Sequence, residues 1–400
     1  MQRLITLSLI VLIGAISITW AAPAPQAEPT ERQIIEAEEP VESLNVAVQT
    51  QITDLTIRGA ANAILDGAFF YNDERLQPQV DYRVQMQTGD LAIRQPGLDG
   101  FAIGTFFSEW DLALNGMTPL ALNVRGAGGD TLLELGDLNL TALDVATADG
   151  SATVRADDNL PMLAGLRLDN ARGAAALILD GSYAALAELH TRTADGTLTA
   201  DLTGRYPALI TIEAEAERAV LDATLDGEFS ALETVSADFV DSRVNLVIDG
   251  TQPTLTTVAL AGNGPAVAVS LPGAFDQLED LSIDSVGAHI ALTMTGVYDL
   301  GTDIRVEGTD GAVDFDVSGI WREALTAQIV TRAGSVRVRV PRNVNARVTT
   351  NAGVANVRAP AFIISDEEPG VYDLRVSNNV PTFMIDIVTE TGTVLLERAT

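Results

Sequence analysis

Arginines dominate the residues that could bind a ligand near the end of this sequence. Residues 324–365 contain no aspartate or glutamate, yet six arginines fall among them. These are Arg332, Arg337, Arg339, Arg342, Arg347 and Arg358. On a chain with a formal net charge of −31, such a stretch predicts an anion-binding patch, which we place at Arg332, Arg342, Arg347 and Arg358. The alternative is a solvated face whose arginines pair with acids on neighbouring strands.

Other reactive residue types are scarce. The chain has no cysteine and only two histidines, His190 and His289, so the sequence predicts no zinc or other metal site. Asp195, Asp241 and Asp310 share one position of the repeat described next, and turn formation is favoured there over an oxygen-rich calcium ladder. We identify no catalytic residue and no cofactor site, and we predict that the chain is not an enzyme.

A 23-residue unit must position these side chains. Glycines recur at this spacing at Gly181, Gly204, Gly227, Gly250, Gly273, Gly296 and Gly319. With the glycine as position 1, position 3 is aromatic in every unit except the one that carries Gln252. Positions 18, 20 and 22 are apolar and positions 19 and 21 mostly polar, the alternation of a strand with one buried face. Positions 9 and 11 indicate a second, shorter strand.

A fixed period of this length predicts a repeat architecture in which each unit buries its apolar face on its neighbours. We expect an all-β fold, a β-solenoid with one coil per repeat, in which about ten to twelve coils form a rod of roughly 50–60 Å. A β-propeller with two units per blade is the alternative. It is disfavoured because a blade has four distinct strands, so a period of about 46 residues would dominate.

The charge pattern tests this stacking directly. Asp314 and Asp316 stand at outward positions of one unit, and Arg337 and Arg339 stand at the same positions of the next. We therefore expect structural ion pairs, Asp314 beside Arg337 and Asp316 beside Arg339. Each exposed pair contributes only about 0.2–1 kcal/mol, so the pairs report the register more than they stabilise the fold.

The first residues predict export from the cytoplasm. Arg3 precedes an apolar run from Leu4 to Ile18, and small residues follow, with a cleavage site after Ala21. This is the pattern of a signal peptide, and an uncleaved N-terminal anchor is the alternative. We predict an extracytoplasmic protein, secreted or at the cell surface, that would contact the membrane only through an uncleaved N-terminal segment.

The segment from residue 44 to about 130 has a different rhythm. It contains LTIRGAANAILDGAFF (55–70), PQVDYRVQMQTGDLAIRQ (78–95) and WDLALNGMTPLALNVRGAGG (110–129). Over residues 44 to about 160 the chain resembles the bacterial toast-rack domains, which are similar to extracytoplasmic domains of LiaF-type cell-wall-stress proteins. Later segments, TRAGSV and TETGTV, resemble the neighbouring "putative adhesin" family. The resemblance implies a β-solenoid at the cell surface, in a family with no established chemistry.

Five segments follow from these patterns. Residues 1–22 are assigned to the signal peptide and 23–43 to a disordered linker rich in Pro and Glu. Residues 44–135 form a toast-rack-like β region, 136–341 the solenoid of 23-residue repeats, and 342–400 degenerate terminal coils.

The predicted function is a non-enzymatic binding or adhesion module of the bacterial envelope. An accessory to envelope-stress sensing and a polysaccharide-acting β-helix enzyme are the alternatives. The expected partner is an anionic cell-wall polymer or another envelope protein. The acidic composition argues against nucleic acid.

Overall fold

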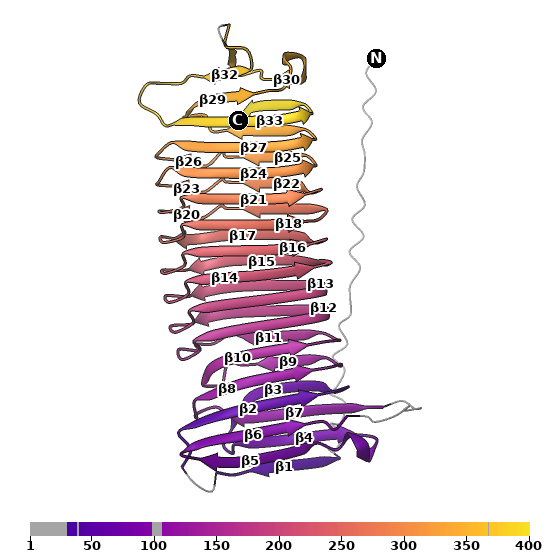
Figure 1. The fold of residues 1–400 in the computed structure, drawn as a ribbon. Helices are drawn as coiled ribbons and strands as arrows, with labels where there is room; N and C mark the ends of the chain where they lie inside the picture. Colours follow the sequence, from indigo (N-terminus) through magenta and orange to yellow (C-terminus); the bar gives the residue numbers. More distant parts are fainter. Residues whose placement is uncertain (1–29, 38–39, 98–105, 367) are drawn as a thin grey trace, which may run out of the picture.

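A computed structural model describes residues 30–37, 40–97, 106–366 and 368–400, and it shows an all-β rod. Successive repeats stack as coils along one axis, from the indigo N-terminal end to the yellow C-terminal end (Figure 1). The predicted β-solenoid is confirmed, and the β-propeller alternative is wrong. The predicted signal peptide, residues 1–22, lies outside the described residues.

Two long faces of strands form the walls of the rod, and all the described strands join one hydrogen-bonded sheet. The first face contains β2 (Ser43–Thr50), β5 (Gln79–Gln85), β6 (Thr88–Arg94), β8 (Leu120–Gly126), β10 (Leu140–Thr147), the first parts of β12 (Gly165–Ser182) and β13 (Glu188–Arg205), β14 (Thr211–Glu217), β16 (Thr234–Val240), β18 (Thr257–Asn263), β21 (Asp280–Val286), β24 (Thr302–Asp310), β27 (Leu325–Ala333), β29 (Asn345–Thr350), β31 (Ile363–Ile364), β32 (Val371–Leu374) and β33 (Thr382–Thr391).

The second face lies behind the first, and β12 and β13 run through both faces. It contains β1 (Glu31–Ile35), β3 (Asp54–Ala61), β4 (Leu65–Tyr71), β7 (Ser108–Asn115), β9 (Thr131–Glu134), β11 (Ala152–Ala156), the second parts of β12 and β13, β15 (Ala219–Glu228), β17 (Arg243–Gln252), β19 (Ala266–Ser270), β22 (His289–Thr293), β25 (Val313–Asp316), β28 (Val336–Val340), β30 (Val357–Arg358) and β34 (Val394–Arg398).

Short elements complete the coils at the corners. They are β20 (Ala274–Phe275), β23 (Val297–Tyr298), β26 (Ile320–Trp321) and the 3-10 turns η1 (Glu74–Leu76) and η2 (Val354–Asn356). None of the described residues forms a helix with the length and apolar character needed to cross a bilayer.

The register of the parallel strands reproduces the sequence period. Along β12 and β13 each residue pairs with its equivalent one repeat later, from Gly165 opposite Glu188 to Ser182 opposite Arg205. Inward side chains of both faces, mostly Leu, Val and Ile, meet in one continuous buried core along the rod. Burial of this apolar surface is the main force that holds the coils together.

Direct stacking explains why each repeat carries a glycine. A Cβ added to Gly204 would lie only 2.1 Å from the carbonyl oxygen of Gly181, and Gly204 has a φ of +101°. A Cβ on each later repeat glycine would lie within 2.6 Å of the preceding glycine oxygen, at Gly227, Gly250, Gly273, Gly296 and Gly319. The backbones approach too closely here for any side chain.

An aromatic column lies beside this glycine corner, as the repeat pattern predicts. The rings of Tyr183 and Tyr206 stack at 5.0 Å and those of Tyr206 and Phe229 at 4.7 Å between centroids. Buried Gln252 interrupts the column, and its Oε1 has no hydrogen-bond partner. Burial raises the pKa of Tyr183 and Tyr206 above the ordinary range of tyrosine.

The hydroxyls of this column repeat one contact. Tyr183, Tyr206 and Tyr298 each donate to the carbonyl oxygen 27 residues upstream, at distances of 2.6–2.9 Å. These acceptors are Ala156, Leu179 and Leu271. The rings therefore bury both their apolar surface and a satisfied polar group.

Both ends of the rod depart from simple sequential stacking. Near the N-terminus β2 lies between β6 and β8, and β3 between β7 and β9. Near the C-terminus β33 lies between β27 and β29, and β34 between β28 and β30 (Figure 1). β2, β3, β33 and β34 therefore each have a hydrogen-bonded neighbour on both sides, which protects these strands near the chain ends from fraying.

One predicted boundary needs correction. Residues 31–35 were expected within the disordered linker 23–43, but they form β1, antiparallel to β4. Its pairing is reinforced by Arg32, whose Nε donates to Asp66 Oδ1 at 2.9 Å. A tertiary partner, β4, supplies the hydrogen bonds that this polar segment cannot make alone.

The glycine corner yields a stability prediction. Gly204→Ala should lower the free energy of unfolding by roughly 1–3 kcal/mol, because alanine strains the backbone at positive φ. Gly165→Ala is the control, because a Cβ there would meet nothing within 4 Å. Thermal unfolding followed by circular dichroism measures both. Equal midpoints for the two variants would contradict the stacking argument.

The interrupted column yields a second prediction. In the Gln252→Tyr variant the new ring would continue the column between Phe229 and Phe275, and its hydroxyl would reach the Leu225 carbonyl by analogy with the other tyrosines. We expect an increase in stability of about 0.5–1.5 kcal/mol for each aromatic pair formed. Gln252→Phe, which lacks the hydroxyl, should gain less. A lower unfolding midpoint for both variants would show that the column cannot accept a ring here.

Candidate binding surface

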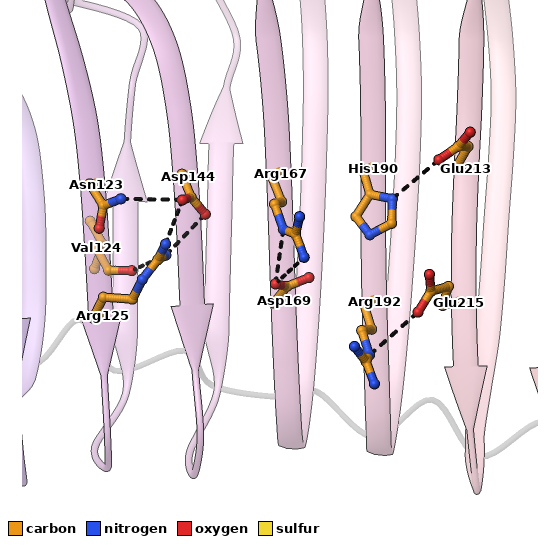
Figure 2. Close-up of polar contacts among 10 residues, drawn as sticks. All are labelled: Asn123, Val124, Arg125, Asp144, Arg167, Asp169, His190, Arg192, Glu213 and Glu215. Atoms are coloured by element: carbon orange, nitrogen blue, oxygen red, sulfur yellow. Dashed lines mark hydrogen bonds and ion pairs between the residues drawn. The ribbon is translucent and has the colours of Figure 1, made fainter.

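Outward side chains of the first face form two rows of charged and polar groups between β8 and β14. The first row contains Asn123, Asp144, Arg167, His190 and Glu213, and the second contains Arg125, Ala146, Asp169, Arg192 and Glu215. Parallel strands at one register place equivalent residues side by side, about 4.8 Å apart. The rows therefore run along the rod axis, across the strands (Figure 2).

Arg125 is held toward the neighbouring strand. Its Nη1 donates to Asp144 Oδ1 at 2.9 Å, and Asn123 Nδ2 donates to the other oxygen of Asp144 at 3.2 Å. Figure 2 shows both side chains turned toward Asp144. The hydrogen bond to Asp144 raises the pKa of Arg125 further above neutrality.

The remaining charges of the rows also have partners of opposite sign. Arg167 Nε donates to Asp169 Oδ2 at 3.0 Å on the same strand. Arg192 Nε lies 3.5 Å from Glu215 Oε2 (Figure 2), and the arginine side chain is 53% exposed. This half-exposed contact is looser than a direct hydrogen bond and leaves donors of Arg192 available to a ligand.

A groove of about 430 Å³ borders the second row, where β2, β8 and β10 end and where β12 and β13 pass from the first face to the second. Its rim carries the polar side chains of Gln49, Arg125, Asp169 and Arg192, and its floor carries small residues. Ala127 and Ala148 follow the last residues of β8 and β10, and Ala171 and Ala194 lie at the equivalent places within β12 and β13. The groove thus combines an apolar floor with a polar rim, the usual composition of a ligand site.

Buried polar side chains also line the groove, at Thr50, Thr147 and Asn170. Thr147 Oγ1 donates to Asn170 Oδ1 at 2.8 Å, while Thr50 Oγ1 and Asn170 Nδ2 have no partner. Gly126 occupies the same row between Thr50 and Thr147, where a side chain is missing. The polar row and the missing side chain mark this corner as less tightly packed than the core.

The structure places two of the four predicted patch arginines beside carboxylates and a third beside a backbone carbonyl. Arg347 contacts Glu368, and Arg332 Nε lies 3.8 Å from Glu390 Oε2. Arg342 Nε donates to the Ala399 carbonyl at 3.0 Å. These acids come from the chain after residue 365, outside the acid-free stretch.

Arg358 differs from the other members of the predicted patch. It lies at the end of β30, is exposed, and makes no ion pair with any residue that the structure describes. The four arginines therefore do not form one group of unpaired cations.

The register places the predicted ion pairs side by side, Asp314 opposite Arg337 and Asp316 opposite Arg339. Arg339 Nη1 lies 3.1 Å from Asp316 Oδ2. Arg337 instead pairs at 2.8 Å with Glu397 of β34, the tucked-in terminal strand on its other side. Arg337 has Glu397 as its partner in place of Asp314 because β34 lies beside β28. The repeat pattern does not predict this neighbour.

The histidines and turn aspartates are distributed along the rod. His190 Nδ1 lies 3.5 Å from Glu213 Oε2, and His289 Nε2 lies 3.6 Å from Asp314 Oδ2. Arg218 donates to Asp195 at 2.8 Å and lowers the pKa of that carboxyl. Within the described ranges, no three or more histidine, aspartate or glutamate side chains gather as a metal site would require.

Other turn aspartates have structural contacts of their own. Asp241 has a φ of +51° and accepts a hydrogen bond from Asn263 Nδ2 at 3.0 Å. Asp310 ends β24. Asp241 and Asp310 thus occupy a bend and a strand end, as their spacing predicts. The prediction of a turn at Asp195 is wrong, because Asp195 lies within β13.

The groove is not among the sites predicted from the sequence. Its signal is weak but present, because small alanines at 148, 171 and 194 give way to Glu217 and Val240 at the equivalent places of the next units. A run of small residues at one outward position leaves a recess in a stacked fold. Only the register shows that these alanines are neighbours.

The comparisons with known proteins concern the N-terminal third most directly. Residues 24–161 match the family described as the N-terminal domain of toast_rack, DUF2154. This part of the chain is similar to toast-rack N-terminal domains. The resemblance stated from residues 44 to about 160 is therefore confirmed, and the toast-rack part supplies β2, β8 and β10 of the groove.

Two solved structures are similar over most of the chain, at low identity. A putative cell adhesion protein from Clostridium sporogenes is 13% identical, with a TM-score of 0.21, and the match covers 92% of this chain and 98% of that protein. A putative adhesin from Bacteroides fragilis is 9% identical, with a TM-score of 0.19, and the match covers 92% and 95%. No curated protein matches the sequence.

The rim of the groove yields a third prediction. A double-mutant cycle with Arg125→Ala and Asp144→Ala should give a coupling energy of about 0.2–1 kcal/mol, because the pair is partly exposed. High salt should reduce this energy by screening. Thermal unfolding of the four proteins at two salt concentrations measures it. A coupling of zero at low salt would show that the cross-strand contact is not formed.

Proposed function

We propose that this chain is a non-enzymatic binding module on the outside of a bacterial envelope, either secreted or held at the cell surface. The observation that carries the proposal is the groove, a concave site built from five adjacent strands of a rigid rod. Because hydrogen-bonded strands form its wall, the site is largely pre-formed, and binding orders few groups.

The toast-rack match supports the location. Toast-rack domains are similar to extracytoplasmic domains of other proteins. The N-terminal segment of this chain has the pattern of an export signal. A continuous core without cysteine also suits a rod that needs no disulfide for stability.

We assign partner binding to the groove rather than to the arginines of residues 324–365. Arg332 and Arg347 already contact glutamates, and the whole chain carries a net charge of −31, which repels polyanions at a distance. Binding of an anionic cell-wall polymer at the arginines is a separate hypothesis that the experiment below also tests. Binding of another envelope protein in the groove is a further hypothesis.

Co-sedimentation of the full exported chain with isolated cell envelopes tests this function. We expect binding that persists at high salt, because apolar and neutral hydrogen-bonded contacts are screened little. The triple variant R342S/R347S/R358S should sediment like the unaltered protein. Salt-sensitive binding that this variant loses would assign the partner to the arginines, and no sedimentation at all would overturn the envelope role.

A further inference from the structure

We propose that the groove binds a neutral, linear polysaccharide that lies along the rod axis. This inference rests on the proposed binding function and names the chemical class of its ligand. Three features of the groove support it: its direction across the strands, its apolar floor with a polar rim, and its balance of charge.

The direction of the groove favours a polymer other than a peptide strand. The groove crosses β2, β8, β10, β12 and β13 in order, a distance of roughly 19 Å at a spacing of about 4.8 Å between strands. Each of these strands is already paired on both sides. A peptide therefore finds no free edge for strand addition. A polysaccharide needs no free strand edge, and the length of one sugar unit is similar to the spacing between strands.

The floor and rim fit the two surfaces of a sugar ring. The methyl groups of Ala148 and Ala171 offer a shallow apolar floor for the C–H face of a ring. On the rim, Arg192 retains exposed donors, and the exposed amide of Gln49 can both donate and accept. Donors and acceptors placed beside an apolar floor match ring hydroxyls, which both donate and accept.

The charge balance favours a neutral ligand over an acidic one. Arg125 pairs with Asp144, and Arg192 with Glu215, so the cations at the rim are offset by adjacent carboxylates. Asp169 pairs in turn with Arg167. An acidic polymer would have to displace these carboxylates while approaching a strongly acidic rod.

Affinity electrophoresis of the full chain tests the ligand class. The gels contain laminarin, dextran, galactomannan or hydroxyethylcellulose as neutral polysaccharides, or polygalacturonate as the acidic one. We expect at least one neutral polysaccharide to retard the protein and polygalacturonate to have no effect. Retardation by polygalacturonate alone, or by none of the five polymers, would overturn the proposal.

Two matched variants locate the binding. The double variant A148L/A171L fills the groove from exposed or half-exposed positions, and it should abolish retardation. Ala261→Leu adds the same side chain at an exposed position of β18, outside the groove, and should leave retardation unchanged. Circular dichroism checks that each variant keeps its β content. Retardation that A148L/A171L leaves intact would place sugar binding elsewhere and refute the inference.

The envelope assay separates this inference from the proposed function. If A148L/A171L no longer sediments with envelopes but no neutral polysaccharide retards the unaltered protein, the groove binds another class of partner. The function then stands and the ligand class is wrong. If the unaltered protein neither sediments nor is retarded, both proposals fail together.

Discussion

The close stacking of parallel backbones at one fixed register is the constraint on which the rest of this structure depends. Each coil hydrogen-bonds to the next along both faces, so a residue always meets its equivalent 23 residues away in the array. At the glycine corner the backbones approach so closely that a Cβ on Gly204 would overlap the oxygen of Gly181. The same register aligns the aromatic column and turns scattered apolar residues into one continuous core.

The register also shapes the outer surface. Because equivalent outward positions are neighbours, a change in residue type from one unit to the next appears as a feature on the rod. Opposite charges in successive units become cross-strand pairs such as Arg339 with Asp316. A succession of alanines becomes the floor of a groove. In such a fold, the residues that differ from the repeat consensus form the functional sites, and the consensus residues maintain the stack.

The ends of the rod obey a different requirement. A stack of parallel strands leaves an open edge at each end, where further strands could add. Here β2, β3, β33 and β34 lie one place inside the stack, and antiparallel strands such as β5 and β31 occupy the outermost positions. At the C-terminal end this arrangement also brings Glu397 beside Arg337, so the capping device and the charge distribution are coupled.

The sequence by itself determined the repeat length and the buried positions, and it favoured the solenoid over a β-propeller because glycine, aromatic and apolar residues recur with a period of 23 rather than 46. It also placed Asp314 opposite Arg337, since register follows from the period. Only the tertiary structure decided the position of β33 and β34 inside the stack, the pairing of β1 with β4, and the groove. Each of these depends on contacts between segments outside the regular spacing, such as Arg337 with Glu397, and a local pattern carries no information about such neighbours.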